Sequence, residues 1–203
     1  MGTKEKIVRK GLELFNKHGI EYVGMRELAY SLGMQIGNIN YYFPTKDDLV
    51  DQLALDLSEL NERTLAIPDE LTLLAFLETR EKIFINQLTY RCLFLSFVHL
   101  VKRNRAIAER YKKVQKMRRD GFTDAIESLQ KEGYIRLDDP GSAGFLASAI
   151  GLVARFWISE AAISDQHRSD EQQIHHYVGL IARLFMPYAT KKGLRQIEDY
   201  LKR

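Results

Sequence analysis

The residues best suited to chemistry in this sequence lie in one stretch near its start, MRELAYSLGMQIGNINYYFPTK, which runs from Met25 to Lys46. Its pattern predicts two short helices joined by a tight turn, over about Met25–Leu32 and Ile36–Tyr42. Glycine and asparagine are poor helix formers, but small and amide side chains let a backbone approach base edges, and asparagine pairs well with adenine. The chemistry indicated is recognition of DNA, with the second helix in the major groove.

Three residues of this stretch have the types and spacing of a helix-turn-helix unit. Ala29 is small enough for the second helix to cross close to it, and Gly33 suits a turn conformation that a Cβ disfavours. Ile39 would pack the inner face of the second helix. We expect the remaining apolar residues to complete a small core: Leu28, Leu32, Met34 and Tyr42.

A helix in front of this stretch would cover the helix-turn-helix unit. It is predicted over Lys4–His18, with Thr3 as its N-cap and Gly19 at its end. Its apolar residues keep a helical period. The three helices together would form a head at residues 1–46.

A helix behind the head is predicted to run to about Ala66, and Pro68 would break the chain after it. Thr45 and Asp48 occupy the positions of a capping box at its start. Lys46 lies in its first turn, where a free helix N-terminus and an ammonium group can hold one phosphate together. This helix would be the mechanical link between the head and the rest of the chain.

The composition indicates an all-α protein, because 203 residues include only four prolines and show no strand-like alternation. Residues 1–46 carry seven Lys and Arg against four Glu, whereas the remaining residues balance at 23 of each sign. A basic head suits a phosphate-facing module. The single cysteine, Cys92, excludes an internal disulfide framework and suits a reducing cytoplasm. Met1 leads directly into a charged helix, so no secretory signal is expected.

Residues 47–203 are predicted to form a larger helical body. Asp139 and Pro140 suit a cap followed by a first helical position, and Ser169 with Gln172 forms a second capping box. Beyond the linking helix, the body helices are expected over about Asp69–Leu88, Tyr90–Lys102, Ala106–Lys131, Pro140–Ser164 and Ser169–Tyr188, with a short tail helix from Gly193.

The segment Ala143–Ile163 is apolar on nearly all sides. A membrane span is one interpretation, but Arg155 and Glu160 interrupt the segment, and a span needs about 20 clean apolar residues. Burial inside the protein is favoured, and no membrane partner is expected.

Small residues recur every three or four positions along the same segment, and such a stripe permits close helix approach. With the helix after Ser169, it suggests a four-helix dimer interface, two helices from each subunit. A contact within one subunit is the alternative. The stripe consists of Gly144, Ala147, Ser148, Gly151 and Ala154.

A second unusual segment, from Lys102 to Arg119, is strongly basic, and its only acidic counterparts are Glu109 and the adjoining Asp120. It could form an additional DNA-facing strip. A charge run on a helix is more often its solvated face, and that interpretation is favoured.

Residues 3–49 resemble the tetracycline-repressor (TetR) family of bacterial transcription regulators. The resemblance rests on the spacing of Ile7, Leu14-Phe15 and Gly19, and on Leu28-Ala29, Leu32-Gly33-Met34, Gly37-Asn38-Ile39, Tyr42-Phe43 and Lys46 with Leu49. It implies a homodimer of all-α subunits, each with a three-helix DNA-binding head and a body that dimerises and often holds an effector pocket. The rest of the chain matches the family only in length and helical character.

The resemblance also implies which residues contact DNA. Arg26 falls where some members read a base from the start of the second helix, and Tyr42 and Lys46 fall at backbone-contacting positions. The recognition-helix face consists of Gln35, Ile36, Gly37, Asn38, Asn40 and Tyr41.

The sequence departs from the family pattern at three places. Val23-Gly24 stands where a capping hydroxyl usually precedes the second helix. Asn40 replaces a frequent tyrosine, which removes a phosphate contact and could add a base contact. Ile20 replaces an aromatic residue.

The leading hypothesis is a ligand-responsive repressor in the bacterial cytoplasm, associated with the nucleoid. Two heads would occupy successive major grooves about 34–36 Å apart on a near-palindromic operator. A small-molecule effector in the body would favour a dimer whose head spacing no longer matches the DNA, which requires different affinities for the two shapes. Repression rather than activation is the majority behaviour of the family.

Aromatic body residues are candidates for the effector pocket, although plain core packing is favoured for any one of them. A guanidinium at Arg155 needs a partner in so apolar a helix. That partner is expected to be Glu78, Glu81 or Glu160 rather than a ligand carboxylate. The candidate pocket residues are Phe84, Phe94, Phe97, Phe122, Arg155, Phe156 and Trp157.

Two other classes of function compete with this hypothesis. One is a DNA-binding regulator without a small-molecule ligand, controlled by a protein partner. The other is a helical metal-dependent enzyme, because Glu171 and His175 lie one helical turn apart. His176 points about 100° away from His175, so surface histidines are the favoured interpretation. No cofactor and no catalytic residue are expected, since the sequence has neither a phosphate-binding glycine loop nor a nucleophile motif.

Overall fold

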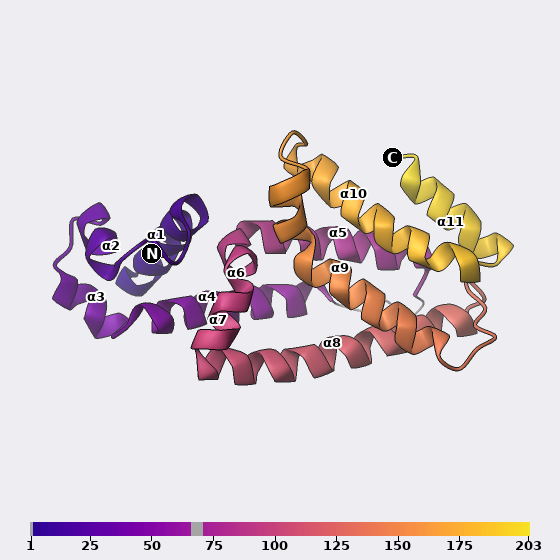
Figure 1. The fold of residues 1–203 in the computed structure, drawn as a ribbon, viewed down its shortest axis with the longest axis horizontal. Helices are drawn as coiled ribbons and strands as arrows, with labels where there is room; N and C mark the ends of the chain where they lie inside the picture. Colours follow the sequence, from indigo (N-terminus) through magenta and orange to yellow (C-terminus); the bar gives the residue numbers. More distant parts are fainter. Residues whose placement is uncertain (1, 66–70) are drawn as a thin grey trace. The chain divides into compact units, whose positions relative to one another are not determined.

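The computed structural model describes residues 2–65 and 71–203, and these residues form helices without a strand (Figure 1). One isolated antiparallel bridge joins Ile135 and Ala189. The chain divides into two compact units. The N-terminal unit comprises Met1–Glu62 and Thr89–Tyr111, and the C-terminal unit comprises Arg63–Leu88 and Lys112–Arg203. The expected all-α fold is therefore confirmed.

The N-terminal unit holds α1 (Thr3–His18), α2 (Met25–Ser31), α3 (Ile36–Tyr42), most of α4 (Lys46–Thr64), α6 (Arg91–Leu95), α7 (Phe97–Arg103) and the start of α8 (Arg105–Lys131). It extends beyond residue 46, because segments from two distant parts of the chain join the three-helix head. The division into domains at residues 1–46 and 47–203 stays a prediction.

Helix α1 begins one residue earlier than predicted. Gly2 is the N-cap, and its backbone N–H donates to Glu5 Oε2 at 2.9 Å. The prediction that Thr3 caps this helix was wrong, because Gly2 takes the N-cap position and Thr3 is the first helical residue. At the other end Gly19 adopts φ 90°, and its N–H donates to Phe15 O at 2.9 Å. A left-handed φ of this kind suits glycine.

The turn between α2 and α3 has the predicted geometry. Gly33 has φ 62°, and the N–H of Met34 donates to Ala29 O at 3.0 Å. Ala29 and Ile39 are buried, at 4% and 0% exposed. Gly33 therefore forms the predicted turn, and Ala29 and Ile39 take the predicted buried positions. Helix α3 has the predicted bounds.

Helix α4 begins with the predicted capping box. Thr45 N–H donates to Asp48 Oδ2 at 2.8 Å, and Asp48 N–H donates to Thr45 Oγ1 at 3.2 Å. The described helix ends at Thr64. The predicted extension to Ala66, the break at Pro68 and the start of the next helix at Asp69 lie outside the described residues.

The predicted single helix over Tyr90–Lys102 is divided at Ser96 into α6 and α7. Asn16 of α1 holds the start of this segment, since Cys92 N–H donates to its Oδ1 at 3.0 Å. Ser96 Oγ donates to Glu21 Oε2 at 2.8 Å at the break itself. Hydrogen bonds to residues some 75 positions away in the chain therefore compete with a continuous helix, and local periodicity does not reveal them.

The C-terminal unit is built from α5 (Leu73–Thr89), the rest of α8, α9 (Ser142–Ser164), α10 (Asp170–Phe185), a 3₁₀ turn η1 (Met186–Tyr188) and α11 (Lys191–Leu201). Trp157 is at its centre, 1% exposed and stacked on Phe84 with ring centroids 4.7 Å apart. Gln87 accepts a hydrogen bond from Trp157 Nε1 and donates to Ala154 O at 3.3 Å. The buried amide thus satisfies the indole N–H inside an apolar core.

The start of α9 differs from the prediction, whereas the start of α10 agrees with it. Helix α9 begins at Ser142, because Asp139 Oδ2 accepts from Gly141 N–H at 2.9 Å and holds a turn before the helix. At α10, Ser169 N–H donates to Gln172 Oε1 at 3.0 Å and the reciprocal bond closes the capping box.

Helix α11 is joined to the loop after α8 by very close packing. Thr190 caps the helix, and its N–H donates to Tyr134 O at 3.0 Å. A Cβ built on Gly193 would lie 2.0 Å from the same oxygen. Only glycine permits this approach, so Gly193 is a packing residue and the tail helix begins two residues before it.

Helix α9 is the one helix of the described chain that is long and apolar enough to cross a membrane by length and composition, and a single such helix is weak evidence for a span. It packs along α10 (Figure 1) and buries Leu146, Ile150 and Trp157. Its inner face is therefore a core face, as burial inside the protein requires.

Candidate nucleic-acid interface

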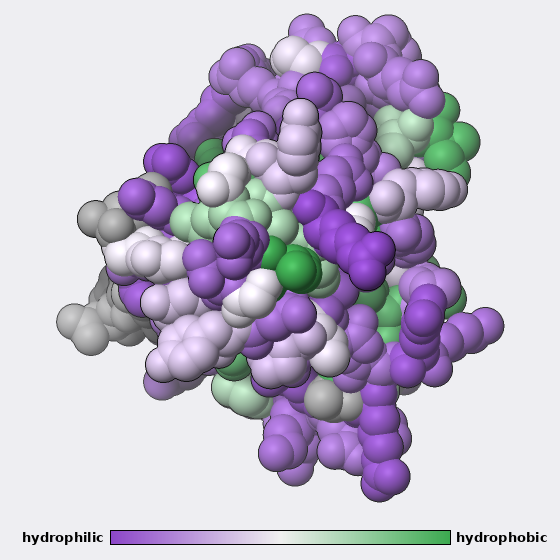
Figure 2. Space-filling model, turned by 90° about the vertical axis from the view of Figure 1, so that its left-hand side faces the viewer, coloured by the Kyte–Doolittle hydropathy of each residue, from purple (hydrophilic) through white to green (hydrophobic). Residues whose placement is uncertain are grey.

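Helix α3 presents a polar outer face over a single apolar anchor. Ile39 is 0% exposed, and it lies on the inner face of this short helix, which packs against α2. The predicted recognition residues are all exposed: Gln35, Ile36, Gly37, Asn38, Asn40 and Tyr41. In Figure 2, which faces the side of Figure 1 that carries α2 and α3, hydrophilic side chains cover most of the surface. The arrangement leaves amide and phenol groups available to a groove.

Helix α2 adds Arg26, which is exposed as a DNA-reading arginine requires. Tyr30 follows one helical turn later and is 89% exposed, and Tyr22 in the preceding loop is 84% exposed. Large exposed aromatic residues at this density are unusual on a protein surface. Sequence reasoning missed both tyrosines, although the four-residue spacing of Arg26 and Tyr30 places them on one helix face.

Tyr42 does not join the small core as predicted. It is 38% exposed, and its ring meets that of Tyr41 edge to face with centroids 5.0 Å apart. The core position is taken by Phe43, which is 3% exposed. Since α3 ends at Tyr42, the extended backbone of the next residue turns Phe43 inward instead.

Lys46 has a structural role that its sequence position did not reveal. Its Nζ donates to Ile20 O at 2.7 Å and to Val23 O at 3.2 Å, which ties the start of α4 to the loop before α2. That loop lacks a capping hydroxyl, because Gly24 is the N-cap of α2 and has no side-chain cap bond. The ammonium supports the loop, and its phosphate contact stays a prediction.

The N-terminus of α4 is also less favourable to a phosphate than predicted. Asp47 and Asp48 lie in its first turn, and carboxylates there already interact with the positive end of the helix dipole. Phosphate binding at this helix start would have to overcome their repulsion.

The basic segment 102–119 does not form one uniform strip. Arg110 is paired with Asp51 of α4, at 2.6 Å between Nη1 and Oδ1, and both side chains are about 70% buried. Arg105 forms an exposed pair with Glu109 at 2.9 Å. Exposed cations occupy the remaining positions apart from the half-buried Arg118: Lys102, Arg103, Lys112, Lys113, Lys116 and Arg119.

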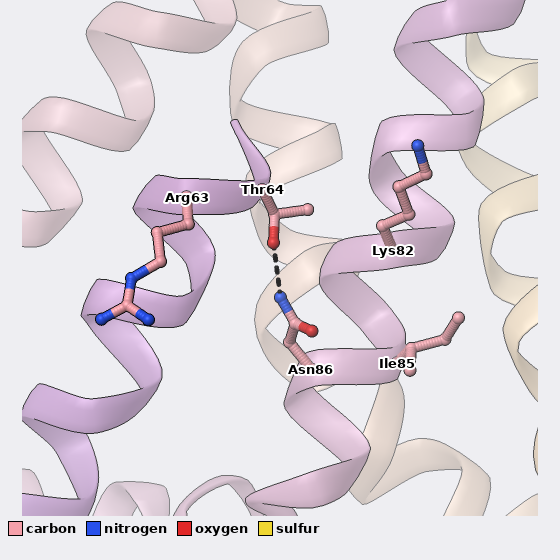
Figure 3. A pocket seen from close by; sticks show the side chains of 5 residues that line it. All are labelled: Arg63, Thr64, Lys82, Ile85 and Asn86. Carbon is pink, nitrogen blue, oxygen red and sulfur yellow. Dashed lines mark hydrogen bonds between the residues drawn. The ribbon is translucent and has the colours of Figure 1, made fainter. Parts of the chain in front are cut away.

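In the C-terminal unit, a surface hollow of about 510 Å³ lies between the end of α4 and α5 (Figure 3). Asn86 Nδ2 donates to Thr64 Oγ1 at 2.9 Å between two of the residues that line it. It is lined by Arg63, Thr64, Lys82, Ile85 and Asn86. None of the predicted pocket residues is among them.

The predicted pocket residues lie in different places. Phe84 and Trp157 stack on one another, and Phe122 is 6% exposed beside Gly151, so these three are part of the packed core. Phe94 and Phe97 belong to the N-terminal unit, where Phe97 meets Tyr111. Arg155 lies 5.7 Å from the ring centroid of its neighbour Phe156.

The carboxylates expected to pair with Arg155 have other partners. Glu78 accepts from Arg203 Nη1 at 2.8 Å, Glu81 from Tyr200 OH at 2.6 Å, and Glu160 from Ser164 Oγ at 2.6 Å. Burial and hydrogen bonding to Glu81 raise the pKa of Tyr200 well above its usual range, so this phenol stays protonated. These bonds occupy one oxygen of each carboxylate, and the pairing of Arg155 with Glu78, Glu81 or Glu160 stays a prediction.

The small-residue stripe on α9 is split between two faces. Ala147 is 3% exposed and belongs to the core of its own unit, whereas Gly144 and Ser148 are exposed. The burial of Ala147 favours the alternative of a contact within one subunit for this residue, and the dimer interface stays a prediction. Both helices also carry exposed apolar residues, namely Phe145, Leu152 and Ile163 on α9 and Leu180 on α10.

The residues considered for a metal site have ordinary surroundings. His175 stacks on Tyr200 and lies 3.9 Å from Glu81 Oε1, while His176 meets Tyr177 edge to face. Burial, and then the nearby Arg168, lower the pKa of His176. Within residues 2–65 and 71–203 no three His, Cys, Asp or Glu side chains come together as metal ligands.

An exposed polar recognition helix on a helix-turn-helix core, followed by a larger helical unit, defines a class of DNA-binding transcription regulators. Comparison with known proteins identifies the family. The sequence model described as "Bacterial transcriptional repressor" (TetR) matches residues 57–197, and that of "Bacterial regulatory proteins, tetR family" matches residues 7–53. The chain belongs to the TetR family.

Individual relatives agree with this assignment. A probable HTH-type transcriptional regulator of Bacillus subtilis, YttP, is 34% identical over 65 residues, which is 32% of this chain and 31% of that protein. A TetR-family regulator from Marinobacter aquaeolei has the same fold, with TM-score 0.88 and 21% identity over 98% of this chain and 99% of that one. A transcriptional regulator from Saccharomonospora viridis in complex with choline gives TM-score 0.70 and 17% identity over 93% and 98%.

The protein is therefore a TetR-family transcriptional regulator that binds DNA. Regulators of this family are transcription factors rather than enzymes. The family assignment therefore argues against the alternative of a helical metal-dependent enzyme.

Proposed function

We propose that this regulator is a homodimeric repressor that binds a near-palindromic operator and is released by a small-molecule effector bound in its C-terminal domain. The exposed face of α3, held by the buried Ile39, is the single observation that supports operator binding most directly. Arg26 and Asn40 are proposed to read bases, and phosphate contacts would supply affinity and register.

The proposal of a homodimer is supported by the outer side of the α9–α10 pair. Phe145, Leu152 and Ile163 are 57%, 58% and 75% exposed along α9, at helical spacing. Contiguous exposed apolar residues indicate an interaction surface. A second copy of the same two helices would cover them in a four-helix arrangement, as an isologous interface requires.

The proposal of an effector is supported by relatives of the same fold. One structure is a complex with choline, and another, a SmeT–triclosan complex, has TM-score 0.65 and 13% identity over 94% of this chain and 93% of that one. The two ligands differ in charge and shape, so they indicate an adaptable body rather than a particular effector.

Control by a protein partner is the second candidate. The observation that favours it is the packing of Phe84, Trp157 and Tyr177, which fill with aromatic rings the space where an effector pocket was expected. Either form of control is compatible with a regulator located in the cytoplasm at the nucleoid.

The test is selection of binding sites from a random double-stranded DNA pool, with the bound complexes sized. We expect enrichment of a palindrome with half-sites about one helical turn apart, bound by a dimer. Weak, salt-sensitive binding without an enriched sequence would contradict operator recognition. Transcription from a promoter that carries the enriched site should then fall when the protein is present, whereas a rise would identify an activator.

A further inference from the structure

Arg80 of α5 is the most deeply buried cation among the described residues of the C-terminal unit. Arg80 is 9% exposed. Its guanidinium carbon lies 5.0 Å from the ring centroid of Phe76 and 5.4 Å from that of Phe122. The buried Nε has no hydrogen-bond partner in the described part of the chain.

This environment is costly for a positive charge. Burying a charge is unfavourable unless it is paired and hydrogen-bonded, and two aromatic faces compensate only in part. Burial, and then the second cation Arg118, lower the pKa of Arg80 to about 10. The guanidinium is still charged at neutral pH, so the unpaired charge persists.

The nearest carboxylates on the same helix are occupied. Glu78 is bonded to Arg203, and Glu81 is bonded to Tyr200. In the described residues Arg80 has aromatic neighbours and another cation, and no carboxylate pairs with it. A carboxylate that pairs with Arg80 would therefore come from outside the described residues.

We propose that Arg80, between Phe76 and Phe122, anchors an effector that carries a carboxylate on an apolar carbon skeleton. This inference rests on the proposed effector-controlled function and specifies the chemical class of the effector. The planar guanidinium offers a carboxylate two parallel hydrogen bonds, and Phe76 and Phe122 offer apolar walls.

The chemistry of the site also excludes other ligand classes. A cation such as choline would be repelled by Arg80 and Arg118. An uncharged alcohol of the same skeleton would leave the guanidinium unpaired. Arg118 is half-buried one turn before Phe122 on α8, so the anion would approach past a second positive charge.

The experiment measures binding of octanoate, 1-octanol and choline to the full chain by calorimetry, with the melting temperature as a second readout. Variants are Arg80→Met, Arg80→Lys and, as a matched control, Lys82→Met, which removes an exposed cation of the same helix beside the surface hollow. Circular dichroism checks that each variant is folded.

We expect octanoate, but neither 1-octanol nor choline, to bind and to raise the melting temperature. Arg80→Met should weaken octanoate binding by about tenfold to a hundredfold, as loss of a charged hydrogen bond predicts. Arg80→Lys should bind octanoate with an affinity between those of the unaltered chain and Arg80→Met, because an ammonium keeps the positive charge but cannot form two parallel hydrogen bonds. Lys82→Met should bind as the unaltered chain does.

Three results would overturn the proposal: no octanoate binding, unchanged binding by Arg80→Met, or loss of binding in Lys82→Met, which would place the anion in the surface hollow. Release from the selected operator DNA separates this inference from the proposed function. If octanoate binds through Arg80 but does not release the operator DNA, the proposed effector control is contradicted and the Arg80 site is not. If octanoate still releases the operator DNA from Arg80→Met, the Arg80 site is contradicted and effector control is not.

Discussion

Individual side chains on α3 differ in what they can do for DNA binding. Asn40 is exposed on the outer face, and its amide can pair with a base edge. Ile39, its neighbour, is fully buried and acts only by fixing the helix. The proposed base-reading residue and the residue that packs the helix are thus adjacent in the chain.

We predict that Asn40→Ala weakens binding to the selected operator by about 1–3 kcal/mol and leaves binding to unrelated DNA nearly unchanged. Titration of both DNAs at one salt concentration measures the difference. The control is Gln166→Ala, which removes an exposed amide after α9. It should change binding to neither the operator nor the unrelated DNA. Equal losses on the two DNAs would exclude base reading by Asn40.

A second prediction at this scale concerns Gly193. Alanine there should destabilise the protein by more than about 2 kcal/mol, because its Cβ would lie 2.0 Å from the backbone oxygen of Tyr134. Gly121→Ala in α8, where a Cβ meets nothing within 4 Å, should instead stabilise by about 0.5–1 kcal/mol. Urea unfolding compares the stabilities of the two variants. Similar unfolding midpoints would refute the close approach of Gly193 to the Tyr134 backbone oxygen.

At the scale of elements, α4 and the start of α8 are joined by the half-buried pair of Asp51 and Arg110. This pair holds the helix that follows the recognition helix. A partly buried, two-point ion pair contributes more than an exposed one, since the median for exposed pairs is near 0–1 kcal/mol.

We predict a coupling energy of about 1–2 kcal/mol from a double-mutant cycle of Asp51→Asn and Arg110→Met. The cycle of Arg105→Met and Glu109→Gln, an exposed pair, should give below about 0.5 kcal/mol. Thermal or urea unfolding of the single and double variants supplies both values. Comparable coupling in the two cycles would show that the Asp51–Arg110 pair does not hold α4.

At the scale of the whole molecule, the proposed homodimer would cover the exposed apolar residues of α9 and α10. Leu152 lies in its middle and is 58% exposed. We predict that Leu152→Glu converts the dimer to monomers, because two buried carboxylates would face each other across an isologous contact.

Light scattering coupled to size-exclusion chromatography measures the change. Ile85→Glu, which alters an isoleucine 54% exposed on α5, is the control and should remain dimeric. A dimer that survives Leu152→Glu and dissociates in Ile85→Glu would move the interface to α5.

The sequence alone determined the local features of this regulator. The helix-turn-helix unit, the bounds of α3, the capping boxes of α4 and α10, and the family resemblance follow from residue types a few positions apart, because caps, turns and helical periods are short-range effects. Exposure of the recognition residues follows from the same period.

Only the tertiary structure decided features that depend on residues distant in the chain. The division of α6 from α7 depends on Asn16 and Glu21, and Gly193 is required by Tyr134. The sequence indicated that Arg155 needs a partner, because its helix is apolar. Arg80 lies in the polar-looking segment LETREK, but packing of Phe76 and Phe122 from two helices removes it from water. Burial is a property of the assembled elements, and no short-range pattern encodes it.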